Sequence, residues 1–525
     1  MDFFEYIIIG SGPAGVSAAL KLEGTDTCMV DVGEQPSASF PFTSLDEALA
    51  SGQVGDVLGK HWEMLSNLAD PVRCHPKLRA QAVRHVMQGE SFQVIGADDN
   101  LLVRGRGSFA AGGMANAWGA QLLRYTDDDL SEAGDWPISA SELTRHYTDL
   151  ETHIGISGEL DDMAAFLGHT DNLLPPVPSV PVTNYMLDRY AAKRCSNGVS
   201  GLRIGRPRLA VLTRPHRGRP AYDFAETEFF TPASGGIYTP RDTLSELRQR
   251  GKIHYLGGHK LIAFREHADY VEIEIEVVKS RQRETIRAKH LLLGCGAMQT
   301  ARLVLLNRAQ TGASLPFIDH PPTLLPVFFP ARFGSRLPQQ SFPIQLIGTL
   351  TGNGERDMIS FYYPAGMLWS DLLPDIPLPM NLARSVLAGM IGGMLVAQIW
   401  EISRPSQGNR MRVEPDGTVR IDYRETQIYS KLSLLLDALR RLGGFSLPGL
   451  ASMSPPSWGF HHAATLPMRL DPEPFETHTD GRLWDSRRIR VIDGSVLPSL
   501  PAKNHSLTIM ANAARIAEQV KLCGY

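Results

Sequence analysis

The stretch EYIIIGSGPAGVSAALKL, residues 5–22, decides the fold of this chain. A short apolar run leads into glycines with the spacing Gly10-x-Gly12-x-x-Gly15, and an alanine-rich helical pattern follows. Such glycines permit a tight turn, a close approach of the backbone to a pyrophosphate, and close packing of the helix on the strand. The stretch therefore predicts a strand, a phosphate-binding turn and a helix, the opening unit of a doubly wound α/β fold.

The next apolar run, TCMVDVG at residues 27–33, places an acid where a nucleotide-binding fold needs one. Asp31 follows Gly10 by about 20 positions, the spacing at which a carboxylate holds the hydroxyls of an adenosine ribose. A glycine-rich turn that binds nothing would not need a strand, a helix and an acid in register. The motif predicts an ADP-containing cofactor and leaves open whether it is FAD or NAD. The predicted contacts are Gly10, Gly12, Pro13, Ala14, Gly15 and Asp31.

The composition is typical of an ordinary globular protein with an ample core. The chain has 525 residues, of which 43% are hydrophobic and 21% charged, and its net charge is −4. Its length corresponds to about three domain-sized units. A mildly acidic chain without a basic stripe gives no reason to expect nucleic acid as a partner.

The cysteines and the apolar segments indicate in which cellular compartment the protein is expected. The 5 cysteines are scattered and no CxxC pair occurs, so neither a disulfide framework nor a metal site is predicted. The N-terminal residues include Asp2 and Glu5 and lack the basic segment of a secretion signal. The most apolar run, residues 385–400, is shorter than the ~20 residues that span a bilayer. We expect a cytoplasmic protein without a membrane span, and a buried place near a cavity for residues 385–400.

Motifs along nearly the whole chain resemble those of one enzyme family, the glucose–methanol–choline (GMC) oxidoreductases, which are FAD enzymes. DWPISASELTRHYTDLETHIGISG, residues 135–158, is similar in particular to the branch that includes the pyranose oxidases. The most specific motifs lie near the C-terminus. The motifs are VDVG (30–33), resembling the family's LEAG; GGMANAWGAQLLRYTDDDL (112–130), resembling its glycine-rich loop; IDHPP (318–322), resembling its DHP; FHHAATLPM (460–468); and IRVIDGSVLPSLPAKNHSLTIMANAARIAE (489–518).

The resemblance implies a catalytic pair. In the family, one member is a histidine in an HxxGT segment, and the other is a histidine or asparagine just before the final helix. The first corresponds to His461, with His462 as the alternative, and the second to Asn504, four residues before Thr508. His505 stands where the family commonly has proline and adds a second proton carrier. An imidazole accepts a proton at neutral pH, and an amide orients the substrate oxygen without competing for that proton.

The resemblance also implies FAD contacts along the chain. The final helix of the family points its N-terminus at the flavin, where about half a positive charge favours negative charge on the reduced ring. The pyranose oxidase branch attaches FAD covalently to a histidine, and Ala117 stands at that position, which predicts FAD held without a covalent link. The implied contacts are Gly112, Gly113, Asn116, Ala117, Leu261, Asp493, Gly494, Asn504 and Ser506.

The predicted fold is a mixed α/β structure, with a Rossmann-like FAD-binding domain and a substrate-binding domain built on an antiparallel sheet. The FAD-binding domain is expected over residues 1–320, with excursions near 40–90 and 160–200, and the substrate-binding domain over 321–449. Residues 450–525 return to the FAD-binding domain with the catalytic pair. Runs of strand-forming residues separated by proline and glycine, one with a hairpin-type Asp-Gly, predict the sheet.

The predicted function is oxidation of an alcohol group of a small molecule, a sugar or a natural-product intermediate. His461 acts as the base, a hydride moves to flavin N5, and oxygen or another acceptor takes the electrons. Ala464 and Pro467 depart from the family pattern beside the histidine. These departures favour an alternative, a redox-neutral or bond-forming flavoenzyme such as a lyase, isomerase or cyclase, since one fold hosts many chemistries. A flavin-binding protein without turnover is a third interpretation, and oxidase and dehydrogenase both stay open.

Overall fold

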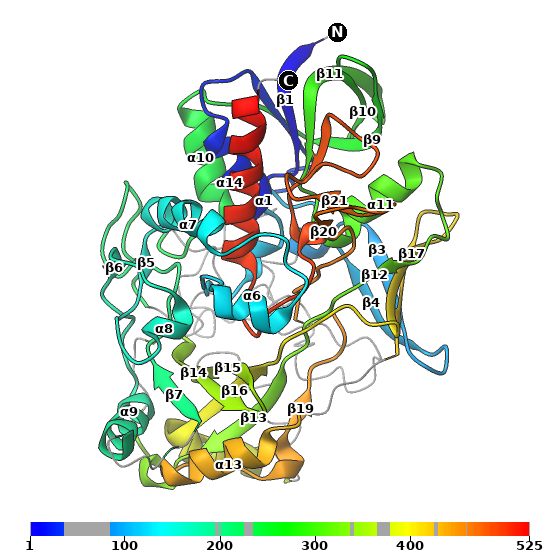
Figure 1. Ribbon diagram of the computed structural model, residues 1–525. Helices are drawn as coiled ribbons and strands as arrows, with labels where there is room; N and C mark the ends of the chain where they lie inside the picture. The colour runs from blue at the N-terminus through cyan, green and yellow to red at the C-terminus, as the bar shows by residue number, and fades with distance from the viewer. Residues whose placement is uncertain are drawn as a thin grey trace.

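The N-terminal fingerprint forms the centre of a seven-stranded sheet in the computed structural model (Figure 1). β1 (Phe3–Ile9) lies parallel to β2 (Thr27–Asp31) on one side and to β11 (Arg283–Leu293) on the other. Its isoleucines are buried, as expected for a central parallel strand covered on both faces. The structure describes residues 2–35, 85–194, 199, 201–224, 235–336, 341–364, 378–424, 429–457 and 459–523.

The strand order of this sheet is β8-β2-β1-β11-β10-β9, and β22 also pairs with β11. α1 (Pro13–Lys21) and α14 (Ser506–Cys523) lie beside one another and share a buried cluster with Ile8 and Leu292 on one face of the sheet (Figure 1). This arrangement confirms the predicted mixed α/β fold with a Rossmann-like part. The further strands are β8 (His254–Gly257), β9 (His259–Glu266), β10 (Val271–Val277) and β22 (Ile489–Val491).

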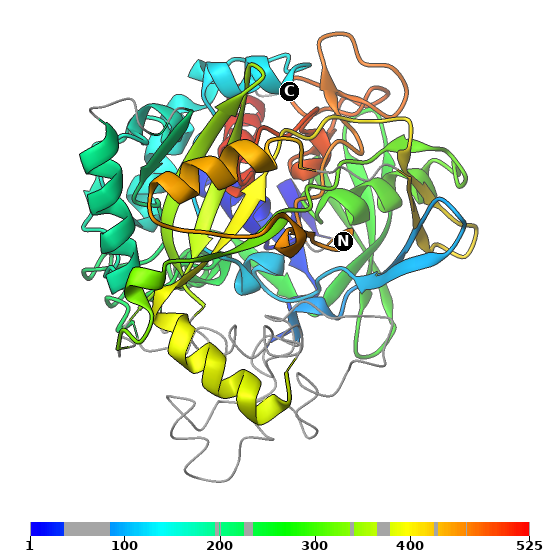
Figure 2. The same ribbon diagram turned by 90° about the horizontal axis from the view of Figure 1, so that it is seen from below.

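A six-stranded sheet, in which every pair is antiparallel, follows the order β19-β13-β16-β15-β14-β7. α9 (Pro181–Arg194) and α13 (Leu432–Arg441) supply residues to its buried cluster, and α13 crosses the strands when viewed from below (Figure 2). The strands are β7 (Leu202–Gly205), β13 (Thr323–Phe328), β14 (Ile344–Gly352), β15 (Glu355–Tyr362), β16 (Met394–Trp400) and β19 (Ser452–Met453).

The predicted hairpin of the middle region lies in a different sheet. β17 (Asn409–Val413) and β18 (Val419–Tyr423) join a five-stranded sheet instead, where β18 pairs in parallel with β3 (Ser91–Ile95). A two-stranded hairpin alone is marginally stable, and β3 supplies a third strand. β4 (Leu101–Arg106) and β12 (Leu315–Pro316) complete this sheet. The expected excursion near 40–90 lies mostly outside the described residues.

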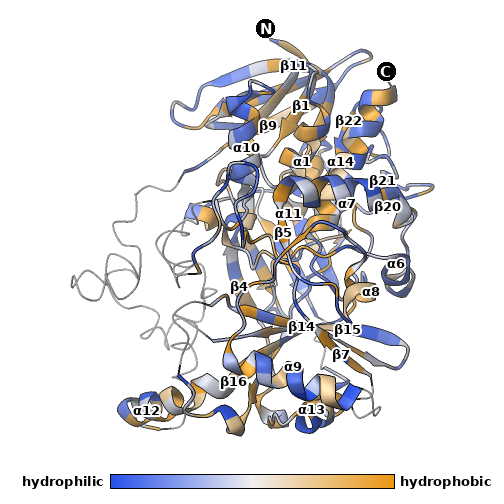
Figure 3. Cartoon of the chain, turned by 90° about the vertical axis from the view of Figure 1, so that its left-hand side faces the viewer, coloured by the Kyte–Doolittle hydropathy of each residue, from blue (hydrophilic) through white to orange (hydrophobic). Residues whose placement is uncertain are grey.

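The apolar run 385–400 is not one buried segment, contrary to the prediction. Its first part belongs to α12 (Met380–Met390), whose Leu382 is 50% exposed and Val386 38% exposed. Its second part is the buried strand β16, and α12 lies at the periphery of the molecule (Figure 3). Between the two parts, Gly392 and Gly393 pack closely on other backbone, because a Cβ on them would lie 2.5 Å from the carbonyl oxygen of Ser335 and 2.6 Å from that of Phe329. In the described ranges, no helix is both long and apolar enough to cross a membrane.

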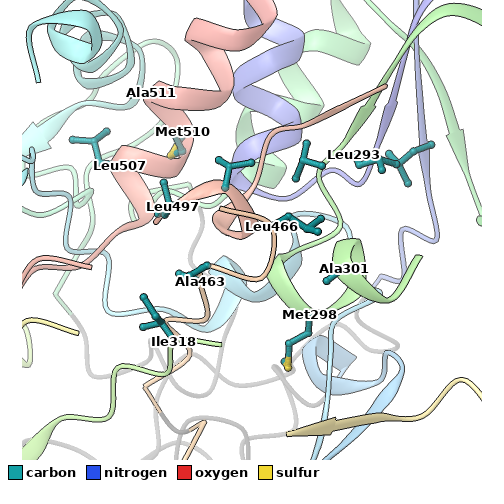
Figure 4. Packing of buried hydrophobic residues seen from close by; sticks show 14 of the residues in the cluster. Leu293, Met298, Ala301, Ile318, Ala463, Leu466, Leu497, Leu507, Met510 and Ala511 are labelled. Atoms are coloured by element: carbon teal, nitrogen blue, oxygen red, sulfur yellow. The ribbon is translucent and has the colours of Figure 1, made fainter. Parts of the chain in front are cut away.

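The remaining elements connect the two large sheets. α11 follows β11, and its Met298 and Ala301 belong to the same buried cluster as Ile318 and Ala463 (Figure 4). Ile318 and Ala463 exchange backbone hydrogen bonds of 3.0 and 3.1 Å, so the loops 318–320 and 461–463 lie side by side. These elements are α6 (Asp127–Ala133), α7 (Ser141–Ile154), α8 (Ala164–Leu167), α11 (Ala297–Asn307), β5 (Ile156–Ser157), β6 (Leu173–Leu174), β20 (Met468–Arg469) and β21 (Thr477–His478).

Candidate active site

A cavity of about 1030 Å³ lies between the seven-stranded and six-stranded sheets. Its lining includes the glycine fingerprint together with His461 and Asn504. Strands β14, β15 and β16 contribute side chains to its wall. The carboxyl ends of β1 and β2 open into it, which is where open α/β sheets bind their ligands.

The fingerprint glycines have separate roles in the structure. Gly10 has a φ of +94°, a left-handed conformation that favours glycine. A Cβ on Gly15 would lie 1.9 Å from the carbonyl oxygen of Gly10, so close packing excludes any side chain there. A Cβ on Gly12 would meet no atom within 4 Å, although Gly12 lines the cavity. Gly12 therefore faces open space in the cavity, which a bound pyrophosphate fits.

Two substitutions separate these roles. Gly12→Ala should leave the thermal stability of the cofactor-free protein unchanged but weaken FAD binding by about tenfold or more, because the methyl group occupies the pyrophosphate's place. Gly15→Ala should lower stability by about 3 kcal/mol or more, because its methyl group overlaps the backbone. Melting curves of both variants and a fluorescence titration with FAD check this expectation. Equal FAD affinity of Gly12→Ala and the wild type would contradict it.

Asp31 is the acid at the end of β2, and it is buried. Its Oδ2 accepts hydrogen bonds from the Ser11 hydroxyl and from the Tyr255 hydroxyl, the latter at 3.2 Å. The Ser11 hydroxyl in turn accepts from the backbone N–H of Gly112 at 2.9 Å. Burial raises the pKa of Asp31 to about 6, although the hydroxyl bonds oppose this rise. A carboxylate at the carboxyl end of β2 that lines the cavity suits the hydroxyls of a ribose.

This raised pKa predicts a pH dependence of cofactor binding. Free protein takes up a proton on Asp31 as the pH falls through about 6. Ribose hydroxyls that donate to the carboxylate would lower its pKa in the complex, so binding releases a proton. FAD affinity should therefore rise with pH, by up to about tenfold per pH unit, and level off above pH 6. Titrations between pH 4.5 and 8 check this, and Asp31→Asn should bind weakly without the pH dependence. A wild-type affinity that falls as the pH rises would contradict the assignment.

The glycine-rich loop lies over the fingerprint. A Cβ on Gly113 would be 3.3 Å from the Cα of Gly12, so the two glycine segments meet across the cavity. Asn116 Nδ2 donates to the carbonyl oxygens of Ala111 and Gly113, at 2.8 and 2.7 Å, and thereby holds the loop closed. Its Oδ1 is buried and has no hydrogen-bond partner among the described residues. Ala117 also lines the cavity, so a cofactor there would contact a methyl group.

The structure places the other predicted cofactor residues around the same cavity. Asp493 accepts four hydrogen bonds from the chain itself, including those from Gly296 N–H at 2.8 Å and Ser495 N–H at 2.9 Å. The carboxylate thus joins the turn before α11 to the short 3₁₀ helix Gly494–Val496. Gly494 approaches the carbonyl oxygen of His462, from which a Cβ would be 2.8 Å away. Leu261 lies in β9 as expected of a hairpin, and it is buried while lining the cavity.

The predicted catalytic pair meets in the structure. Nε2 of His461 lies 3.3 Å from Nδ2 of Asn504, and both side chains line the cavity. The indole of Trp400 stacks on the His461 ring, with centroids 4.5 Å apart and an interplanar angle of 22°. Oδ1 of Asn504 is buried without a partner among the residues described. This arrangement leaves one imidazole nitrogen and one amide facing the same part of the cavity.

His462 and His505 have different surroundings. The ring of His462 packs against Phe317 and Phe92, with centroid distances of 5.5 and 6.3 Å, and its Nε2 is 4.0 Å from Asp319 Oδ1. The ring of His505 lies 4.6 Å from that of His461, and its Nδ1 has no hydrogen-bond partner in the described part of the chain. Of the two neighbouring histidines, His461 is therefore the one that contacts Asn504.

Burial keeps these imidazoles neutral. It lowers the pKa of His462 to about 4 and that of His505 to about 3. The pKa of His461 lies well below its usual value, mainly because the ring is buried and also because other imidazoles lie beside it. A neutral His461 is ready to accept a proton at pH 7. Despite this gathering of histidines, no group of His, Cys, Asp or Glu in the described residues is placed to hold a metal ion.

Lys503, which was not among the predicted site residues, anchors the turn that carries Asn504. Lys503 is fully buried, and its Nζ pairs with Asp129 and donates to the carbonyl oxygens of Arg124, at 3.2 Å, and Phe166. Asp129 belongs to the capping box of α6. A charged residue between prolines and an apolar helix was the signal in the sequence. Ser11, Tyr255 and Trp400 were missed as well, because their contacts join segments far apart in the chain.

Comparisons with known proteins agree with this site. A family model described as GMC oxidoreductase matches residues 454–513, the segment with both His461 and Asn504. A 2-methyl-1,2-propanediol dehydrogenase of Mycolicibacterium austroafricanum is 22% identical over 99% of this chain and 95% of its own length. The resemblance to the GMC oxidoreductases is confirmed. The chain is an oxidoreductase of the class that acts on alcohols, and the GMC oxidoreductases that it resembles are FAD-binding flavoproteins.

Solved structures share the fold of this chain. Pyridoxine 4-oxidase from Mesorbium loti superposes with a TM-score of 0.62 and 14% identity, covering 99% of both chains. A variant of formate oxidase from Aspergillus oryzae superposes with a TM-score of 0.60 and 12% identity, covering 99% of this chain and 98% of its own. At these identities the likeness shows the fold alone. The narrower resemblance to the pyranose oxidase branch stays a prediction.

Proposed function

We propose that this chain oxidises an alcohol group of a small molecule, with His461 as the base. The observation that carries the proposal is the contact between His461 and Asn504 in the same cavity that the dinucleotide fingerprint lines. FAD, when bound, supplies the acceptor for the hydride that leaves the alcohol carbon. The related dehydrogenase of a small branched diol supports an alcohol as the substrate.

His461 takes the hydroxyl proton on Nε2, the nitrogen that faces Asn504. Its lowered pKa keeps that nitrogen unprotonated at neutral pH. Nδ2 of Asn504 donates a hydrogen bond to the substrate oxygen and holds it beside the base, since an amide N–H does not compete for the proton. Trp400 fixes the plane of the His461 ring by stacking on it. Together the three side chains orient the hydroxyl and remove its proton.

The N-terminus of α14 and His505 complete this end of the cavity. α14 is 18 residues long and begins at Ser506, which lines the cavity. Its free N–H groups and its dipole favour negative charge beside Asn504. His505 is neutral at pH 7 because burial lowers its pKa to about 3, so its unpartnered Nδ1 offers a further hydrogen-bond acceptor. Ala117, which has no nucleophilic atom, supports FAD held by contacts and not by a covalent bond.

The part of the cavity wall formed by β16 and its neighbouring strands favours an alcohol with an apolar body over a sugar. Val396, Gln398 and Trp400 alternate along β16 and all line the cavity, and Tyr362 pairs with Val396 in the next strand. Leu324 pairs with Gln398 on its other side. Gln398 Oε1 is buried without a partner among the described residues, so it can accept one hydrogen bond from a substrate. A sugar would leave most of its hydroxyls against apolar side chains, at a cost of about 1–3 kcal/mol for each unpaired group.

A redox-neutral reaction is the second candidate, and Ala464 was the departure that favoured it. Ala464 has a φ of +63°, a conformation that glycine adopts readily. The turn of the family's HxxGT segment is therefore compatible with alanine here, and His461 still contacts Asn504. This geometry weakens the reason for the second candidate. Absence of any flavin reduction by alcohols would be the observation in its favour.

The test is an anaerobic screen of the FAD-loaded protein. Branched aliphatic diols, aromatic and terpenoid alcohols, and sugars are added in turn while the absorbance of oxidised flavin is followed. The proposal predicts bleaching by an alcohol with an apolar body and formation of the aldehyde or ketone, with sugars inactive. Product formation without bleaching, under conditions in which air is excluded, would instead establish a redox-neutral reaction. Bleaching by sugars alone would overturn the substrate part of the proposal.

A further inference from the structure

His320 lies directly behind His461, on the side away from the cavity. It is 1% exposed and is not part of the cavity lining. Its Nε2 lies 2.5 Å from the carbonyl oxygen of Glu401, and its Nδ1 lies 3.3 Å from Nδ1 of His461. A chain of polar contacts therefore runs from the Glu401 carbonyl through His320 and His461 to Asn504.

The chemistry of these groups determines where each proton lies. A carbonyl oxygen only accepts hydrogen bonds, so Nε2 of His320 carries its proton. Burial lowers the pKa of His320 to about 4, so the ring is neutral and its Nδ1 has a lone pair. That lone pair accepts a hydrogen bond from Nδ1–H of His461. His461 is neutral as well, so its Nε2 is unprotonated and faces Asn504.

We propose that His320 is a positioning residue that fixes the tautomer of His461, through its contacts with the Glu401 carbonyl and with Nδ1 of His461. The inference rests on the proposed function, in which Nε2 of His461 is the base. Without an acceptor behind it, His461 can instead carry its proton on Nε2, and the Asn504 amide can turn over so that Oδ1, which has no partner among the described residues, accepts that proton's hydrogen bond. In that tautomer the nitrogen that faces the substrate can accept nothing.

The surroundings hold His320 in this position. Its backbone N–H donates to the Asp319 carboxylate at 3.0 Å, and the same carboxylate accepts from Ser457 N–H at 2.5 Å. A Cβ on Gly459 would lie 2.2 Å from the His320 carbonyl oxygen, so the loop before His461 packs directly on the His320 backbone. Trp400 contacts both rings, edge-on to His320 at 4.9 Å and stacked on His461 at 4.5 Å. The two imidazoles are thus held as one unit.

The experiment compares variants that keep or remove the acceptor at position 320. His320→Asn retains an oxygen close to the place of Nδ1, whereas His320→Leu removes every acceptor, and His320→Phe does so with a ring that still packs on Trp400. The protein is labelled with ¹⁵N in its histidine rings, and the His461 signals are assigned as those absent from His461→Gln. The tautomer is read in the FAD-loaded and the cofactor-free protein, and FAD content and melting temperature are recorded for each variant.

The wild type and His320→Asn should carry the His461 proton on Nδ1. His320→Leu and His320→Phe should carry it on Nε2 and oxidise substrate about 10²- to 10⁴-fold more slowly, the scale seen when a base is held in the wrong tautomer. A wild-type proton on Nε2, or an unchanged tautomer in both apolar variants, would overturn the inference. The ring signals do not depend on turnover, so failure of the inference appears in the spectra, whereas failure of the proposed function appears as the absence of any alcohol that reduces the flavin.

Discussion

Replacing His461 with alanine is expected to slow substrate oxidation by about 10²- to 10⁴-fold, the usual contribution of a general base. The imidazole contacts Asn504 in the cavity, is neutral at pH 7, and no other imidazole is within the same contact of that amide among the described residues. Stopped-flow measurement of flavin bleaching in the absence of oxygen isolates the step concerned. FAD content should stay unchanged, because this variant retains the predicted pyrophosphate and ribose contacts at Gly12 and Asp31.

His462→Gln is the matched comparison. This neighbour packs between Phe92 and Phe317 and contacts no part of Asn504 that the structure records, so its loss should slow oxidation far less. The two variants change the same residue type at adjacent positions with similar burial. If His462→Gln slowed bleaching more than His461→Ala, the assignment of the base would have to be exchanged.

The second large effect concerns stability. Lys503→Met should destabilise the protein by about 3–5 kcal/mol, because it leaves the buried Asp129 carboxylate and two buried carbonyl oxygens without their donor. Arg356 still lies 3.3 Å from Asp129 and offsets part of the loss. Because Lys503 precedes Asn504, substrate oxidation should also fall in the protein that remains folded. Chemical unfolding followed by fluorescence measures the first effect.

The control for the buried Lys503–Asp129 ion pair is a lysine–aspartate ion pair that is more exposed to solvent. Lys21 and Asp149 form an ion pair at 2.5 Å with side-chain exposures of 20% and 51%. Lys21→Met should change the free energy of unfolding by less than about 1 kcal/mol, as is usual for surface pairs. Comparable losses for both lysines would show that Lys503 does not owe its effect to the buried pair.

Local patterns were sufficient to predict the nucleotide-binding part of the fold. The strand before Gly10, the helix after it and the strand that ends at Asp31 all form as expected, because the period of apolar residues and the glycine spacing are local properties. The predicted proximity of His461 and Asn504 came from a resemblance, since nothing local connects residues so far apart in the chain. The contact in the structure agrees with it.

The sequence does not predict which strands and side chains far apart in the chain come into contact. Nothing in the run at 419–423 indicates that it pairs with 91–95, because strand propensity does not specify a partner. For the same reason, β7 was not expected in the six-stranded sheet. His320 was quoted only as part of a DHP-like motif, and its contact with His461 depends on two loops brought together by the Ile318–Ala463 bridge. Lys503 was overlooked because its partner, Asp129, is distant in sequence.

The central claim is that this chain removes a hydride from an alcohol while His461 takes the proton. Its most direct test is the rate of flavin bleaching, without oxygen, by an alcohol identified in the screen and by the same alcohol deuterated at the carbinol carbon. Hydride transfer predicts bleaching in both cases, distinctly slower with deuterium, and carbonyl product equal in amount to the flavin bleached. Product formed while the flavin stays oxidised, at a rate that deuterium does not change, would contradict it.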